Sequence, residues 1–314
     1  MMAVYNLSGN IIGIDSSSTV FVNVKDFEAT GDGITDDASA IQSALDFVKT
    51  QGGIIYFPVG TYLIKSAILF YSHQTLLFEN GSKILQGASI NNLMRTYCNS
   101  SFTGYDGVHD CLIYGGIFDG GNFETNNTLV GTCHAKNITF ENCKFLNAYG
   151  TYHNLEINSS YNVKIINCEF EGSRKTDENG ELVQIDGAGA ASYYPWDSAN
   201  MDNTVSKYID VKGCLFRNSP IATGVGNHSN MYHKFIRIHD CVFDGFTTGR
   251  AIGFMPYTTN IDIHDNTFSE CEYGIKTGGS SIYAYDNRFV DVTTAIEGTY
   301  VTSHANMING TYTA

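Results

Sequence analysis

The chain has 314 residues, of which 43% are hydrophobic and only 16% are charged. This balance excludes a disordered chain and a long coiled coil. With 18 Lys and Arg against 32 Asp and Glu, the net charge is −14, so we expect no binding to nucleic acid or to an anionic membrane surface. The 20 Tyr, 19 Phe, 32 Gly and only four Pro are typical of a chain rich in strands and tight turns.

Residues 1–20 contain neither a basic segment nor an apolar run of signal-peptide length. We interpret them as an N-terminal tail before a single domain over residues 21–314. No stretch reaches the roughly 20 apolar residues that a membrane span needs. The sequence therefore predicts neither signal-directed export nor a membrane anchor.

Residues 22–64 form the first predicted unit of the domain. DFEATGDGITDD precedes a segment with apolar residues at helical spacing, and GGIIYFPVGTY follows that segment. We predict a helix over Asp37–Thr50, because Ala38, Ile41 and Leu45 fall on one face. The open end of a stack of strands exposes strand edges and core, and an amphipathic helix can cover it. We expect this unit to be a cap.

One strand motif recurs from residue 111 onward, and most copies end in Cys-x-Phe or Asn-x-Phe. The seven copies are CLIYGGIF (111–118), NITFENCKF (137–145), NVKIINCEF (162–170), YIDVKGCLF (208–216), FIRIHDCVF (235–243), NIDIHDNTF (260–268) and SIYAYDNRF (281–289). The final Phe residues are spaced by 27, 25, 46, 27, 25 and 21 residues. The 46-residue step is close to two of the others and contains another strand-like segment, ELVQID. We therefore expect about eight coils from seven written copies.

Apolar residues alternate within each copy, as Ile138 and Phe140 do, which predicts a strand with one buried face. Coils of 20–30 residues that stack parallel strands form a right-handed parallel β-helix. We predict an all-β, single-stranded right-handed parallel β-helix with an N-terminal capping helix. The Phe column is expected to stack in the core. Beside it we expect an internal polar ladder with reduced cysteines: Cys143, Cys168, Cys214, Cys241, Asn266 and Asn287.

Residues 22–64 resemble the N-terminal motif of the pectate-lyase-like superfamily in DFEATGDGITDD and GGIIYFPVGTY. That superfamily includes polygalacturonases, alginate epimerases and lyases, and phage tailspikes. The resemblance implies a β-helix and a polysaccharide ligand, but it does not select the reaction. The tailspike members, together with the lack of a visible signal, suggest a phage or prophage virion tail or a protein released outside the cell. They also allow a homotrimer.

A second strand follows each Phe, and its outward positions carry acids and amides. Such residues are depleted on solvent-facing strand positions, so their convergence on three adjacent coils indicates a site. With Leu155, Ile157, Val183 and Ile185 facing inward, alternation gives the outward set. This set comprises Glu156, Asn158, Gln184, Asp186 and His228, with Arg250 and Lys276 further along. Two glycines in GVGNHS leave Asn227 as the alternative to His228, and His153 precedes one strand. His233, His239 and His264 are interpreted as structural.

Residues 173–206 interrupt the coil period beside this set and are predicted to form a functional loop. Tyr193, Tyr194 and Trp196 would stack on sugar rings, or alternatively pin the loop to the body. Arg174 and Lys175, with Arg250, would pair with the carboxylate of a uronate sugar. The predicted partner is therefore an acidic polysaccharide.

Two reactions fit these residue types. A lyase needs a group that neutralises the uronate carboxylate, such as Gln184, Asn158 or Asn227, and a base, such as His228 or His153. A hydrolase needs two carboxylates about 5–9.5 Å apart, which Glu156 and Asp186 could supply.

The motif comparison favours the lyase. The GHG and RIK motifs of polygalacturonases are absent, and the Asp-Pro-His-Glu motif of the epimerases has only a loose counterpart in HNLE. We therefore favour a lyase acting by β-elimination, with hydrolysis and epimerisation as alternatives. A phage receptor-binding protein that only holds glycan is the alternative of another class. No cofactor is expected, although calcium could also neutralise the uronate carboxylate.

Overall fold

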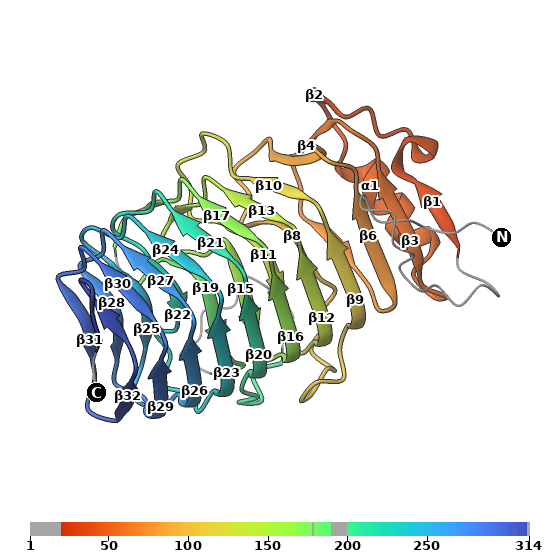
Figure 1. The fold of residues 1–314 in the computed structure, drawn as a ribbon. Coiled ribbons are helices and arrows are strands. Elements are labelled where there is room, and N and C mark those ends of the chain that lie inside the picture. The colour runs from red at the N-terminus through yellow and green to blue at the C-terminus, as the bar shows by residue number, and fades with distance from the viewer. Residues whose placement is uncertain (1–19, 178, 190–199, 313–314) are drawn as a thin grey trace.

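A computed structural model describes residues 20–177, 179–189 and 200–312. Its strands form three long sheets that wind around a common axis, and Figure 1 shows the coils stacked from the N-terminal to the C-terminal end. All strand pairs in these sheets are parallel except the last pair of the second sheet. The predicted right-handed parallel β-helix is confirmed.

The first sheet contains eleven strands, and seven of them, from β9 to β29, begin the copies of the repeated motif. They are β1 (Phe21–Asn23), β3 (Gly53–Phe57), β6 (Gln74–Phe78), β9 (His109–Tyr114), β12 (Lys136–Glu141), β16 (Tyr161–Ile166), β20 (Lys207–Lys212), β23 (Lys234–His239), β26 (Thr259–His264), β29 (Ser280–Tyr285) and β32 (Val301–His304).

The second sheet contains twelve short strands and includes the Phe column. They are β2 (Asp32–Asp36), β4 (Thr61–Ile64), β7 (Lys83–Gln86), β10 (Ile117–Asp119), β13 (Lys144–Leu146), β17 (Glu169–Glu171), β21 (Leu215–Arg217), β24 (Val242–Asp244), β27 (Thr267–Ser269), β30 (Arg288–Val290), β33 (Met307–Ile308) and β34 (Thr311–Tyr312).

The third sheet contains nine strands and carries the predicted site. They are β5 (Ile68–Phe70), β8 (Asn92–Thr96), β11 (Thr128–Thr132), β15 (Leu155–Asn158), β19 (Glu181–Asp186), β22 (Thr223–Gly226), β25 (Arg250–Phe254), β28 (Tyr273–Thr277) and β31 (Thr294–Glu297). A small separate pair joins β14 (Tyr149–Gly150) to β18 (Arg174–Lys175).

The N-terminal end carries a 3-10 helix, η1 (Val24–Phe27), and the helix α1 (Ala38–Phe47). Ile41 and Leu45 of α1 are fully buried in the core, and Figure 1 shows the helix at the end of the stack. The predicted helix therefore exists, but it is shorter than Asp37–Thr50. The Asp37 carboxylate accepts hydrogen bonds from the backbone N–H groups of Thr30 and Gly31, so it fastens the preceding loop rather than extending the helix.

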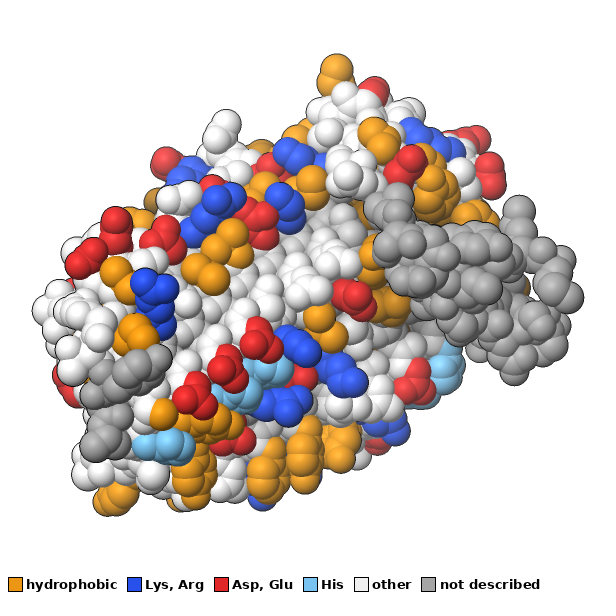
Figure 2. All heavy atoms as spheres, in the orientation of Figure 1, with side chains coloured by type: hydrophobic (Ala, Val, Ile, Leu, Met, Phe, Trp, Pro, Cys, Tyr) orange, Lys and Arg blue, Asp and Glu red, His pale blue; other side chains and the backbone are white. Residues whose placement is uncertain are grey.

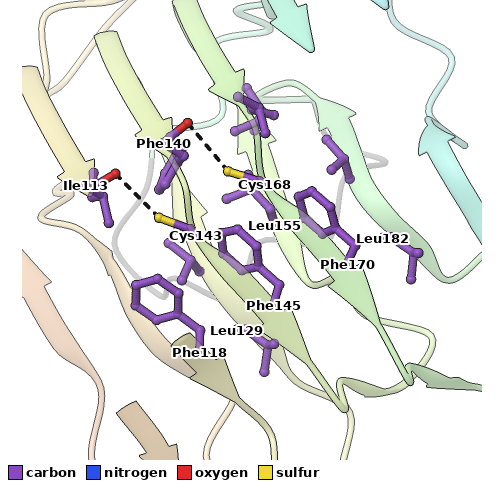
Figure 3. Packing of buried hydrophobic residues seen from close by; sticks show 14 of the residues in the cluster. Ile113, Phe118, Leu129, Phe140, Cys143, Phe145, Leu155, Cys168, Phe170 and Leu182 are labelled. Atoms are coloured by element: carbon purple, nitrogen blue, oxygen red, sulfur yellow. Dashed lines mark hydrogen bonds between the residues drawn. The ribbon is translucent and has the colours of Figure 1, made fainter. Parts of the chain in front are cut away.

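The core confirms the two predicted columns (Figure 3). Phe145, Phe170 and Phe216 stack with ring centroids 4.8 Å apart at each step. The eight cysteines are buried, and the Cys143 thiol donates to the carbonyl of Ile113 at 3.4 Å. At the C-terminal end the column continues through amides, and Asn287 Nδ2 donates to Asn306 Oδ1 at 3.0 Å. The polar side chains of this column thus form hydrogen bonds from one coil to the neighbouring coil.

The 46-residue step is one coil, so the expectation of about eight coils from seven copies was wrong. Phe170 pairs directly with Phe216 in neighbouring strands, with no coil between them. ELVQID is β19, the third-sheet strand of that same coil, in register with β15 and β22. Sequence spacing counts residues rather than turns of the helix. The extra residues lie in the sequence between Asp186, where β19 ends, and Lys207, where β20 begins.

The outer surface pairs charges between coils, as Arg237 Nε on β23 does with Asp210 Oδ1 on β20 at 2.9 Å. Figure 2 shows basic and acidic side chains side by side on the outer surface. Among the described residues, no helix has the length and apolar character to cross a bilayer.

Candidate active site

The third sheet brings the predicted polar side chains together on three adjacent strands. Glu156 on β15 pairs with Gln184 on β19, and Gln184 pairs with Gly226 on β22. The alternating residues Leu155 and Ile157 belong to the hydrophobic core, and Glu156 between them points to a cavity. Parallel pairing without a shift therefore aligns the outward side chains in rows.

A cavity of about 490 Å³ opens over these rows. Its lining residues are Thr128, Thr151, Tyr152, His153, Glu156, Asp177, Asn179, Gln184, Asp186, His228 and Met255. All five residues predicted to be catalytic are in this list. Gly131 and Gly226 stand beside Glu156 and Gln184 in the same outward row, so no side chain fills the row on either side of the two polar groups.

Glu156 is a buried carboxyl group with few partners. Its side chain is 2% exposed and accepts hydrogen bonds from Thr128 Oγ1 at 3.3 Å and Asn158 Nδ2 at 3.2 Å. Burial raises the pKa of Glu156 to about 8, and the nearby Asp186 adds to this rise. At neutral pH the group therefore carries a proton that it can donate.

Asp186 lies diagonally across from Glu156, one strand over and two residues along. Strand geometry puts their Cα atoms about 8 Å apart. The Asp186 carboxylate accepts hydrogen bonds from Gln184 Nε2 at 3.2 Å and from the Gly187 backbone N–H at 2.7 Å. The two acids thus have different hydrogen-bond partners and line the same cavity.

His228 closes the C-terminal side of the cavity and is held by an acid that the sequence did not single out. Its Nδ1 lies 3.1 Å from both carboxylate oxygens of Glu181, the first residue of β19. This hydrogen bond raises the pKa of His228 to about 9, so its imidazole is a cation at neutral pH. Burial raises the pKa of Glu181, and the hydrogen bond from His228 opposes that rise.

Glu181 escaped prediction because strict alternation would put it on the same face as Val183. Instead Leu182 and Val183 are both fully buried, and the Glu181 carboxylate reaches His228 at the cavity. The same apolar doublet occurs at Leu129–Val130 and Ala251–Ile252, also fully buried. Two adjacent apolar residues in these strands were therefore the sequence signal that could have pointed to Glu181.

His153 occupies the same row as Glu181 on the preceding coil. Its Nδ1 lies 3.4 Å from Glu181 Oε2, and only 5% of the residue is exposed. Burial lowers the pKa of His153 well below its usual range, and the charges of Lys175 and His228 add to this effect. The cavity therefore pairs a neutral imidazole with a cationic one.

The predicted substrate-binding residues among the described part of the chain lie outside the cavity lining. Asn158 donates to Glu156, and Asn227 bonds the Thr258 hydroxyl at 3.0 Å and the Met255 N–H at 2.9 Å. Between Asn227 and His228, it is His228 that faces the cavity. Both asparagines are buried and support the neighbouring groups.

The predicted basic residues have partners of their own. Arg174 donates to the carbonyls of Gly121 and Phe123, and Lys276 lies 3.7 Å from Glu297. Lys175 is buried and donates to the Tyr152 carbonyl, and burial lowers its pKa to about 7. Arg250 follows Glu181 in the row after one intervening residue, Thr223. A role in substrate binding stays a prediction for all four.

Two groups of predicted residues remain. Tyr193, Tyr194 and Trp196 lie outside the described residues. His233 is fully buried between the Ser206 N–H and the Ser229 hydroxyl, at 3.1 Å from each, in keeping with the structural role expected for it.

A parallel β-helix with acids and histidines in a cavity on one sheet defines a pectate-lyase-like protein. The family model described as "Rhamnogalacturonase A/epimerase, pectate lyase-like" matches residues 21–297. The chain belongs to this family, which confirms the resemblance found in residues 22–64.

A curated relative, the plasmin and fibronectin-binding protein A of Streptococcus pneumoniae, is 27% identical over 315 residues. The match covers 88% of this chain and 42% of the relative, so the chain spans less than half of that protein.

Solved structures of several β-helix proteins are similar in fold. PfbA, a surface adhesin of Streptococcus pneumoniae, has a TM-score of 0.76 at 23% identity, covering 92% of this chain and 78% of that chain. A family 28 exopolygalacturonase of Yersinia enterocolitica has a TM-score of 0.70 at 14% identity, covering 93% and 66%. A tailspike mutant of E. coli bacteriophage HK620, in complex with a pentasaccharide, has a TM-score of 0.61 at 15% identity, covering 91% and 63%. At these identities the likeness establishes the fold alone.

Proposed function

We propose that the chain hydrolyses an acidic polysaccharide in this cavity, with Glu156 as general acid and Asp186 as general base. The observation that carries the proposal is the pair of carboxyl groups in different surroundings. Both groups are buried, but the pKa of Glu156 is raised to about 8 and its hydrogen bonds come from side chains, whereas Asp186 also accepts a backbone N–H. Two acids with unlike environments are the usual basis for assigning acid and base roles.

In this reaction Glu156 donates its proton to the oxygen of the scissile glycosidic bond as that bond breaks. Asp186 accepts a proton from a water molecule that attacks the sugar carbon from the opposite face. The two acids occupy neighbouring strands, diagonally related, at about 8 Å between Cα atoms. Inversion at the sugar carbon follows from this proposed direct attack by water.

The cationic His228 supports an acidic substrate. Its Nδ1 is held by Glu181, and its side chain remains 41% exposed at the cavity. A charged imidazole can donate a hydrogen bond to a uronate carboxylate, and such bonds are stronger than neutral ones. Gln184, whose Nε2 lies 3.3 Å from His228 Nε2, supplies a neighbouring amide.

β-Elimination is the second candidate, and the neutral His153 favours it. With a pKa of about 9, His228 holds a proton at neutral pH and suits carboxylate neutralisation better than proton abstraction. His153 is uncharged and lines the same cavity, so the role of base would pass to it.

The biological setting belongs to this proposal as well. The tailspike neighbour supports a place on a phage or prophage tail, where a homotrimer would fit, and the streptococcal adhesin supports a released or surface-exposed protein. The same adhesin raises the alternative that the chain binds without cleaving. Either setting exposes the cavity to extracellular polysaccharide.

The test is incubation with a panel of uronate-containing polysaccharides, with two readouts on each sample. Hydrolysis produces new reducing ends without ultraviolet absorbance from unsaturated uronate ends. Elimination produces both signals. Binding of a polysaccharide without either signal, across the panel, would contradict both enzymatic hypotheses and leave the adhesin alternative.

A further inference from the structure

A second cluster of polar side chains lies on the first sheet, in coils before those of the cavity. His73 lies in the turn before β6, and His109 and Asp110 are the first two residues of β9. One ligand atom from each residue lies within 4.8 Å of the other two. The cluster shares no residue with the cavity lining.

The Nδ1 atoms of both histidines lie near the same carboxylate oxygen of Asp110. Asp110 Oδ2 lies 2.9 Å from His109 Nδ1 and 3.7 Å from His73 Nδ1. Ligand atoms around a four-coordinate ion with bonds of roughly 2.0–2.2 Å stand roughly 3.3 Å apart. The two distances to Asp110 Oδ2 lie on either side of this value, and the two imidazole nitrogens are within 4.8 Å of each other.

The other oxygen of the carboxylate is fixed by the next coil. Asp110 Oδ1 accepts a hydrogen bond from Asn137 Nδ2 at 2.7 Å, and this bond turns Oδ2 toward the two imidazoles. Metal-binding carboxylates are commonly hydrogen-bonded in this way on the side away from the metal. The bond is independent of the two histidines.

The backbone also holds the ligands in place. His73 and Asp110 adopt left-handed φ angles of 61° and 59°, and Asn137 follows at 55° in the next coil. This turn repeats from coil to coil, so the side chains project in a row. The imidazole rings of His73 and His109 meet edge to face, with centroids 4.6 Å apart.

We propose that His73, His109 and Asp110 form a binding site for a divalent transition-metal ion, with zinc as the preferred occupant. Two imidazoles and one carboxylate suit zinc, whereas calcium requires six or more oxygen ligands. The side chains of His73 and Asp110 are 53% and 46% exposed, so an ion can enter from solvent and retain water in its remaining position. The bound ion would tie together the two coils that carry His73 and Asp110.

Isothermal titration calorimetry with zinc chloride tests this site, using untagged full-length protein first stripped with a chelator. We expect about one zinc ion per chain and no measurable heat with calcium. His73→Ala and Asp110→Asn should each weaken zinc binding by at least 10-fold. Asn137→Ala should weaken it by about 10-fold through the loss of orientation.

His264→Ala is the matched control. His264 is also an outer histidine of the first sheet, and its Nδ1 lies 2.8 Å from the following Asp265. It is not part of a three-ligand group, so its replacement should leave zinc affinity unchanged. Absence of zinc binding would overturn the proposal. So would equal affinities in the wild type and in the folded His73→Ala and Asp110→Asn proteins, with folding judged by circular dichroism.

Discussion

At the scale of single residues, the cavity shifts the pKa values of three side chains away from their usual ranges. Burial raises the pKa of Glu156 to about 8, and burial lowers the pKa of His153 well below its usual range. The hydrogen bond with Glu181 raises the pKa of His228 to about 9. An acid and a cation therefore face the same space at neutral pH, which suits the cleavage of an anionic chain.

Glu156→Gln should reduce the rate of polysaccharide cleavage by about 100-fold or more, because the proton donor is lost. The amide can still bond Thr128, so thermal unfolding should change little. Glu297→Gln is a control further along the same outward row, at an exposed acid that faces Lys276. A cleavage rate in Glu156→Gln equal to that of the control would remove Glu156 from the role of acid.

The pH dependence of cleavage follows from the same group. Because Glu156 must be protonated to act as the acid, the rate should fall as pH rises through about 8. The measurement is kcat/KM across pH with a polysaccharide whose own charge is constant in that range. A rate that still rises above pH 9 would argue against Glu156 and in favour of a base that works when deprotonated.

Glu181→Gln should lower the pKa of His228 from about 9 toward the usual value near 6.5, measured by NMR titration of the ring. The pKa of His228 is higher in the folded protein than in the unfolded chain. Protonation of His228 therefore stabilises the fold fully below the unfolded pKa, and this contribution is lost as pH rises through about 9. The variant should therefore lose more stability at pH 6 than at pH 9.5. His264 lies outside the cavity and is the reference, because its ring signals should be the same in the variant and in the wild type.

At the scale of elements, the ladder of cysteines and asparagines joins each coil to the next. Asn287 Nδ2 donates to the Ile263 carbonyl at 2.8 Å, and Asn287 Oδ1 accepts from Asn266 Nδ2 at 3.0 Å. Cys143 and Cys168 occupy the same column with thiols that donate to carbonyls. A small polar side chain that donates to the preceding coil is thus what the column requires.

Asn287→Ala should lower the free energy of unfolding by about 1–3 kcal/mol, because buried partners lose their hydrogen bonds. Asn287→Cys should cost less, since a thiol can reach the carbonyl as it does in earlier coils. Urea denaturation followed by circular dichroism compares the two variants. Equal losses in both would show that the position requires the full amide rather than any donor.

The same elements show what the sequence could and could not predict. Alternation in the repeated strands predicted the inward face, and with it the rows that bring Glu156, Gln184 and Asp186 together. It missed Glu181, because the two residues that follow it, Leu182 and Val183, are both buried and break the alternation. It also counted one enlarged coil as two, because an insertion adds residues without adding a turn.

At the scale of the whole molecule, a rigid stack with internal ladders carries the cavity on one sheet. The Phe stack and the polar column fix the coils in register, so side chains far apart in the sequence meet in rows. The hydrogen-bond partners of individual side chains were harder to predict than the fold. Bonds to backbone carbonyls, such as those that Arg174 makes, leave no periodic signal in the sequence. The family match over residues 21–297 covers most of this stack.

The most direct test of the account is a crystal structure of Glu156→Gln with a bound uronate oligosaccharide. We predict that the bridging oxygen between two sugars lies within hydrogen-bonding distance of the side chain at position 156. A uronate carboxylate should contact His228 or Gln184, and a water molecule should lie beside Asp186. An oligosaccharide bound elsewhere on the β-helix, with this cavity empty, would contradict the assignment of the site.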